Sequence, residues 1–134
     1  MTRTRLPIVR EFMDTYVDIV SPEMDIMEAV NFLLQKRITG APVTNAKGKL
    51  LGMISELDCL KVLTHATGRE MLRGKVRDFM TADVQSIPPT MDVYYVAGLF
   101  MRVHFRRFPV VENGRLVGAI TRFDILRFMA NNLL

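Results

Sequence analysis

The sequence of 134 residues has one cysteine, no tryptophan and no apolar run approaching the roughly 18–20 residues needed to cross a bilayer. A single cysteine excludes a disulfide framework, so a reducing compartment is the default expectation. The first twelve residues lack the apolar stretch of a secretory signal. We therefore expect a soluble, cytoplasmic protein.

The chain also lacks a large excess of either positive or negative charge. The chain has 18 Lys and Arg against 14 Asp and Glu, a net charge of +4. Residues 1–67 hold eight of each kind, so the excess lies in residues 68–134, with ten basic against six acidic residues. This asymmetry indicates an anionic partner, but the excess is small beside the basic stripes of nucleic-acid binders. A small phosphorylated ligand would need no more.

Signals for catalysis and for metal binding are missing. His65 and His104 have no Cys, His or carboxylate at the spacing of metal ligands, and no nucleophile motif is present. Cys59 is expected to be a small apolar side chain and not a redox sensor. The sequence therefore predicts no enzyme, no metal site and no required cofactor. The hydrophobic content of 49% is enough to form a core.

The chain is an internal repeat. Val-Arg-Glu-Phe-Met at residues 9–13 returns as Val-Arg-Asp-Phe-Met at residues 76–80, an offset of 67, and Pro42-Val43 returns as Pro109-Val110 at the same offset. After one extra turn residue in the first copy the offset becomes 66. It then relates the residues Gly48, Leu50, Gly52, Ile54, Asp58 and Leu60 to Gly114, Leu116, Gly118, Ile120, Asp124 and Leu126.

These repeats predict two pseudo-symmetric α/β (α+β) units. Residues 6–66 form the first, residues 67–75 a linker, and residues 76–131 the second. Each unit reads as a strand, a helix, a hairpin of two strands and a last helix, that is, a small three-stranded sheet with two helices. Units of this size cannot close a sheet edge and a core alone, so we expect them to pack as one intramolecular pair.

Helix starts are marked by capping residues. Asp25 with Glu28 predicts a capping box at the first helix, which should end near Arg37. Ser55 with Asp58, and Thr121 with Asp124, show the Ser/Thr-x-x-acid pattern at the last helix of each unit. These last two pairs have two interpretations, a capping role alone or a ligand-binding role as well.

The motifs in this order resemble the cystathionine β-synthase (CBS) domain, and the whole chain resembles a tandem CBS pair, also called a Bateman module and found as a stand-alone protein. The motifs are residues 9–13 and 76–80, the two Pro-Val pairs, the hairpin glycines, and the Ser/Thr-x-x-Asp of each last helix. The resemblance implies two clefts between the units that bind adenosine ligands such as AMP, ADP, ATP or S-adenosylmethionine. It further implies a regulatory, energy-sensing role, a flat homodimer and an effector partner.

In nucleotide-binding members the Asp of the motif accepts hydrogen bonds from the ribose hydroxyls, and a helix N-terminus favours phosphate. The resemblance therefore implies two sites. The first cleft combines Thr121, Asp124, Arg106, Arg107 and Arg122 with Ile19, Val20, Ala41 and Pro42. The second combines Ser55, Asp58, Thr39 and Arg37 with Ser86, Ile87, Phe108 and Pro109.

The two sites are not equivalent in sequence. Arg106 precedes Asp124 where related units supply a base to the phosphate, whereas the first repeat has Thr39 at the aligned position. We therefore expect phosphate at Asp124 and a second or vestigial site at Asp58. Met- and Phe-rich segments, residues 94–101 and 123–129, are expected to supply an association surface.

Two other functions stay open. One is a constitutive interaction module whose clefts hold no ligand. The other is weak nucleic-acid binding through basic and aromatic residues of the second half. The arginines considered for it are Arg102, Arg106, Arg107, Arg115, Arg122 and Arg127.

Overall fold

The computed structural model describes residues 5–65 and 73–133. They form two compact units, one of residues 18–84 and one of residues 1–17 with 85–134. Residues 67–72 of the predicted linker lie outside the described part.

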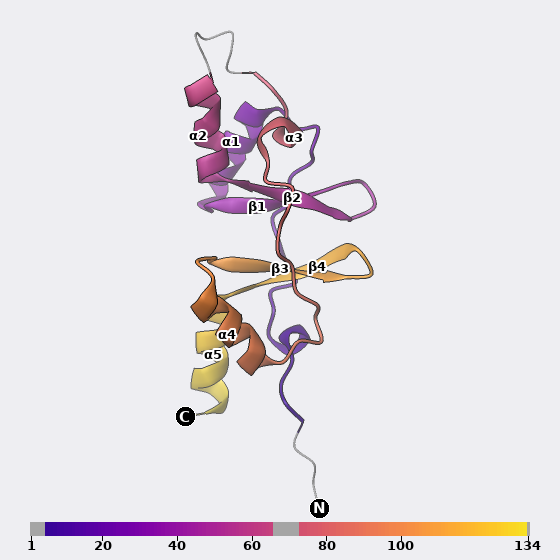
Figure 1. The fold of residues 1–134 in the computed structure, drawn as a ribbon, viewed down its shortest axis with the longest axis vertical. Helices are drawn as coiled ribbons and strands as arrows, with labels where there is room; N and C mark the ends of the chain where they lie inside the picture. Colours follow the sequence, from indigo (N-terminus) through magenta and orange to yellow (C-terminus); the bar gives the residue numbers. More distant parts are fainter. Residues whose placement is uncertain (1–4, 66–72, 134) are drawn as a thin grey trace, which may run out of the picture. The chain divides into compact units, whose positions relative to one another are not determined.

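The unit of residues 18–84 is a hairpin with two packed helices on one side (Figure 1). Its helices and strands are α1 (Ile26–Lys36), β1 (Gly40–Thr44), β2 (Leu50–Ser55), α2 (Glu56–His65) and the short α3 (Val76–Phe79). The strands pair antiparallel, with Ala41 opposite Ile54. Helix α1 ends at Lys36, close to the predicted end near Arg37, and Arg37 itself has a left-handed backbone conformation.

The second unit repeats this arrangement. It contains a 3₁₀ turn η1 (Val9–Glu11), α4 (Val93–Arg102), β3 (Arg107–Glu112), β4 (Arg115–Thr121) and α5 (Arg122–Asn132). The β3–β4 turn places Asn113 and Gly114 at positive φ, the geometry of a type I′ hairpin turn. Thus the predicted hairpins and mixed α/β class are confirmed.

The predicted third strand of each sheet is reduced to one parallel bridge. Val20 pairs with Val43, and Ile87 pairs with Val110, beside sheets of two strands. Proline stands two residues further on in both cases, at Pro22 and at Pro89, where the next N–H of the ladder would lie, and proline has no N–H to donate. The pairing therefore stops after one residue.

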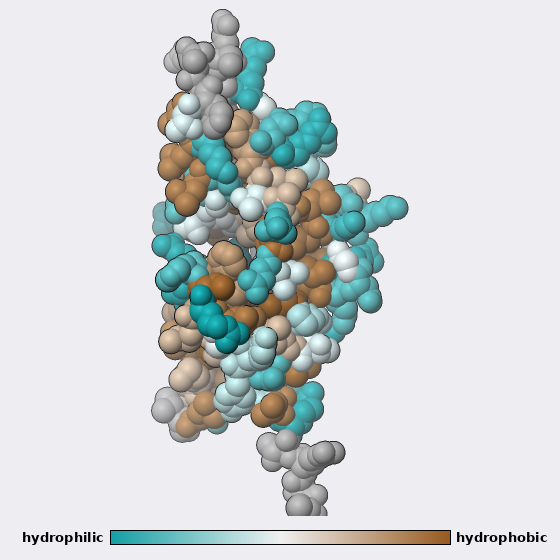
Figure 2. Space-filling model, viewed as in Figure 1, coloured by the Kyte–Doolittle hydropathy of each residue, from teal (hydrophilic) through white to brown (hydrophobic). Residues whose placement is uncertain are grey.

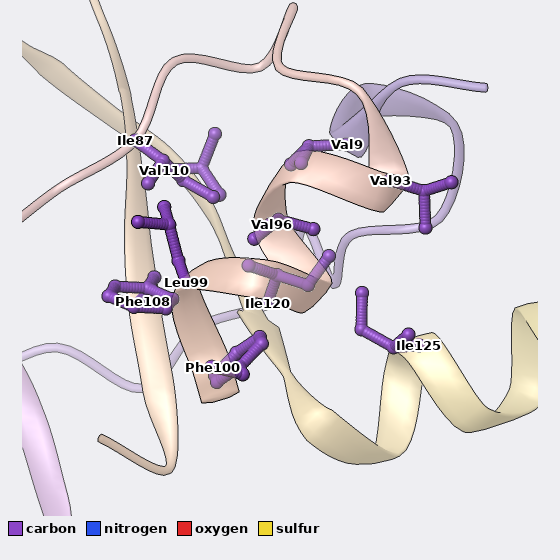
Figure 3. Close-up of a cluster of buried hydrophobic side chains, with 10 residues drawn as sticks. All are labelled: Val9, Ile87, Val93, Val96, Leu99, Phe100, Phe108, Val110, Ile120 and Ile125. Carbon is purple, nitrogen blue, oxygen red and sulfur yellow. The ribbon is translucent and has the colours of Figure 1, made fainter. Parts of the chain in front are cut away.

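The segments that open the two repeats are exchanged between the units. We call residues 9–14 and 76–81 the first and second lead-in segments. Val9 is fully buried in the core that the second repeat provides, and Figure 3 shows it entering from the N-terminal segment beside Val96. Val76 is likewise buried in the core that the first repeat provides. Each unit therefore contains residues of both repeats.

One predicted helix cap is wrong. Asp25 begins α1 but its side chain makes no capping hydrogen bond, so the predicted capping box with Glu28 is absent. The N–H of Ile26 donates to the carbonyl of Gly74 at 2.9 Å, and the N–H of Val93 donates to the carbonyl of Pro7 at 2.9 Å in the second unit. In the second unit Asp92 does cap α4, accepting from the N–H of Tyr95 at 2.9 Å.

Candidate functional site: two capped carboxylates

Asp58 and Asp124 are buried acids in equivalent places, with 3% and 4% of their surface exposed. Each lies in the first turn of the last helix of its repeat, α2 or α5. A buried carboxylate is stable only when hydrogen bonds or cations compensate for the loss of water. The partners of these acids therefore define what each can still bind.

Capping uses one oxygen of each acid. Oδ2 of Asp58 accepts from the N–H of Ser55 at 2.9 Å and from its hydroxyl at 3.0 Å. Oδ2 of Asp124 accepts from the N–H and hydroxyl of Thr121 at 2.8 and 3.0 Å. The predicted capping hydrogen bonds are therefore present in both pairs, and they leave the second oxygen of each carboxylate for other partners.

Cations three residues further along each helix reach that second oxygen. Lys61 Nζ donates to Oδ1 of Asp58 at 3.1 Å, and Arg127 Nη2 donates to Oδ1 of Asp124. Both side chains are about half exposed, at 52% and 57%. Lys61 and Arg127 occupy equivalent repeat positions, a regularity visible in the sequence that our sequence analysis missed.

A residue from the second lead-in segment completes the surroundings of Asp58. Thr81 Oγ1 donates to Oδ1 of Asp58 at 3.1 Å. The backbone of Thr81 also pairs with Met53 of β2 through two 2.9 Å hydrogen bonds. No local sequence signal could reveal this partner, because 23 residues separate Thr81 from Asp58.

A surface hollow of about 350 Å³ lies beside Asp124. The side chains around it include the aromatic residues Phe12 and Phe128, whose ring centroids are 5.2 Å apart. The others are Glu11, Asp124, Arg127, Asn131 and Asn132. The hollow therefore offers aromatic faces, amides and a cation next to the buried acid.

The remaining predicted site residues divide by burial. Arg106, Arg122, Arg37, Thr39, Ser86 and Ile19 are exposed, and Arg107 is half-buried. The side chains of Val20, Ala41, Ile87 and Phe108 belong to the two cores, and Pro42 and Pro109 are buried too. The structure thus brings Thr121 together with Asp124, and Ser55 together with Asp58, and commits the buried apolar residues to packing.

Apolar side chains are exposed on the helices predicted to form an association surface. On α5, Phe123 and Leu126 are 64% and 57% exposed, and on α4 Met101 is 86% exposed. Helix α2 has Leu57, Leu60 and Leu63 exposed as well, and Figure 2 shows apolar side chains over this helix. Clustered exposed apolar residues are typical of interaction surfaces.

The thiol of Cys59 adjoins the Asp58 site. Burial raises the pKa of Cys59 above its ordinary value, and the nearby carboxylate of Asp58 raises it further, because both disfavour the thiolate. The fraction of thiolate at pH 8 is therefore reduced.

We expect iodoacetamide to alkylate Cys59 several-fold more slowly in the folded protein at pH 8 than in urea, where the thiol has its ordinary pKa. The folded rate should keep increasing at pH values where the unfolded rate has levelled off. The two rates can be measured by mass spectrometry of the intact protein. Equal rates in both states would contradict this environment for Cys59.

The chain belongs to the CBS domain family, whose profile matches residues 9–65 and 76–131. No helix in residues 5–65 and 73–133 is long and apolar enough to cross a membrane.

Particular relatives support this assignment. The chain is 34% identical to protein MJ1225 of Methanocaldococcus jannaschii over 92% of its own length and 43% of that protein, so it spans under half of this relative. It is similar to the structure of CBSX2 in complex with AMP, with 27% identity, a TM-score of 0.84, and 96% and 99% of the two chains covered. CBSX2 is a CBS-pair protein of Arabidopsis thaliana.

A second similar structure is the CBS domain pair of protein MJ0100 in complex with 5′-methylthioadenosine and S-adenosylmethionine. Its identity is 25% and its TM-score 0.76, with 95% of this chain and 98% of that chain covered. The likeness extends over both repeats, so the present chain is a tandem CBS pair.

Proposed function

We propose that this protein is a regulatory module that binds an adenosine nucleotide, AMP, ADP or ATP, and signals to a partner by a change in conformation or association. The observation that carries the proposal is the repeated buried carboxylate, Asp58 and Asp124, at the start of α2 and α5. AMP in CBSX2, and S-adenosylmethionine with 5′-methylthioadenosine in the MJ0100 pair, support an adenosine ligand.

The chemistry of the Asp124 site fits such a ligand. A carboxylate can accept a hydrogen bond from a ribose hydroxyl. The N-terminus of α5 favours a phosphate, and Arg122 is exposed at its first residue. Arg106 is a further exposed cation on the chain just before β3.

The pairing of each acid with residues of the other repeat stays a prediction from the resemblance. It assigns Ile19, Val20, Ala41 and Pro42 to the Asp124 site. It assigns Ser86, Ile87, Phe108 and Pro109, with Thr39 and Arg37, to the Asp58 site.

We propose a binding role and not a catalytic one, because the two acids occupy equivalent positions and each caps its own helix. Two groups in equivalent positions fit a duplicated binding element better than an acid–base pair with divided roles. The exposed apolar residues of α2 and α5 support the homodimer and effector partner predicted from the resemblance. A constitutive interaction module is the second candidate, favoured by the same surface.

The proposal is tested by thermal unfolding with AMP, ADP, ATP, S-adenosylmethionine and NAD. At 100 times its dissociation constant a ligand stabilises the folded state by about 2.7 kcal/mol. We expect Asp124→Asn to remove this stabilisation. Asp92→Asn is the matched control, because Asp92 caps α4 of the same unit and its loss should leave the ligand response intact.

A flat response to every ligand would support the constitutive module. A response that Asp124→Asn leaves unchanged would place the ligand elsewhere.

A further inference from the structure

The two carboxylates differ in the number of hydrogen-bond donors that already reach them. A carboxylate has about four acceptor positions, two on each oxygen. Four protein donors reach Asp58: the N–H and hydroxyl of Ser55, the ammonium of Lys61 and the hydroxyl of Thr81. Its acceptor capacity is filled.

Asp124 has one donor fewer in the part of the chain that the structure describes. It accepts from the N–H and hydroxyl of Thr121 and from Arg127. One acceptor position on Oδ1 therefore stays open. Asp124 is also one of the residues that line the hollow described above.

The difference originates in the lead-in segments. Thr81 occupies the repeat position of Asp14, at the offset of 67 residues that relates the segments. Both residues pair through their backbones with a hairpin strand, Thr81 with Met53 and Asp14 with Ala119. The side chain of Asp14 has no hydroxyl to donate, and it accepts instead from the N–H of Tyr16 at 2.9 Å. Asp14 therefore cannot fill the acceptor of Asp124 as Thr81 fills that of Asp58.

We propose that Thr81 determines how many ligands the chain binds, by occupying the acceptor of Asp58 and leaving Asp124 as the single open site. A ribose would have to displace Thr81 or Lys61 from Asp58, whereas Asp124 offers it a vacant acceptor position at once. A buried acceptor without a donor is costly, so the carboxylate of Asp58 keeps its hydrogen bonds from Lys61 and Thr81. This inference rests on the proposed function.

The experiment is calorimetric titration with AMP of the full chain and its variants. Wild type should bind about one AMP per chain, and Asp124→Asn should abolish this binding. Thr81→Val removes the hydroxyl but keeps the shape and the backbone pairing, and should raise the number bound to about two. Thr81→Ser keeps a hydroxyl and should restore a value of about one.

The reverse substitution, which gives the Asp124 site a threonine at the position equivalent to Thr81, provides a second test. Asp14→Thr supplies the missing donor beside Asp124 and should weaken AMP binding about tenfold, which is about 1.4 kcal/mol. Thr90→Val, an exposed threonine of the same unit, is the control and should change neither number nor affinity.

The outcomes separate the two proposals. If neither wild type nor Thr81→Val binds AMP or any other nucleotide of the panel, the proposed function fails and this inference with it. If wild type binds two AMP, or one that Asp124→Asn leaves in place, or if Thr81→Val gains no second site, the inference is overturned and the proposed function stands.

Discussion

A fragment of residues 18–84 is expected to unfold cooperatively, whereas a fragment of residues 9–65, cut where the repeat begins and ends, should stay largely unfolded. The first fragment contains Val76, which is fully buried in the core of this unit, and the second lacks it. Burying one valine contributes about 1.5–3 kcal/mol, a large share of the roughly 5–15 kcal/mol that stabilises a domain. The second fragment also loses both hydrogen bonds between Met53 and Thr81.

Circular dichroism during urea titration measures the difference. A synthetic peptide of residues 73–84 provides the control, since adding it to a fragment of residues 18–65 should restore helix signal. If the fragment of residues 9–65 folded as well as that of residues 18–84, the lead-in segments would not be exchanged.

Gly118→Ala is expected to lower the free energy of unfolding by about 1–3 kcal/mol. A Cβ at this position would lie 2.8 Å from the backbone oxygen of Asp14, where the first lead-in segment crosses β4. Gly52→Ala should have the same effect in the other unit, because its Cβ would lie 2.5 Å from the oxygen of Thr81. In both cases the added Cβ would meet a backbone oxygen, so no change of side-chain rotamer can relieve the steric clash.

Gly98→Ala is the matched control. Gly98 lies inside α4, and its added Cβ would come no closer than 3.6 Å to the end of the Arg102 side chain. Alanine there should stabilise the protein by about 0.5–1 kcal/mol, because glycine costs more entropy in a helix. The midpoints of urea unfolding report all three variants, and a neutral Gly118→Ala would show that the lead-in segment can move away from β4.

Local patterns in the sequence predict the parts of the site that lie within one helix turn. The spacing of Ser55 with Asp58, and of Thr121 with Asp124, is enough to predict the caps, because a capping box involves only the first helical turn. Asn113-Gly114 similarly predicts its hairpin turn. These features depend on neighbours in the chain and need no knowledge of tertiary packing.

The sequence could not predict which repeat each lead-in segment packs against. Val9 and Val76 occupy equivalent positions, so packing on their own repeat or on the other one produces the same pattern of residues. The bond from Thr81 to Asp58 follows from that choice. Only the three-dimensional structure distinguishes the two arrangements.

The exchange of the lead-in segments also bears on the ancestry of the duplication. A chain with one repeat has one lead-in segment and could complete the arrangement seen here only by giving that segment to a second molecule and receiving one in return. Such an ancestor would be a segment-swapped dimer, in which the concentration of the protein limits folding. Fusing two copies into one chain removes this dependence. It also frees the two lead-in positions to diverge, as Asp14 and Thr81 have done.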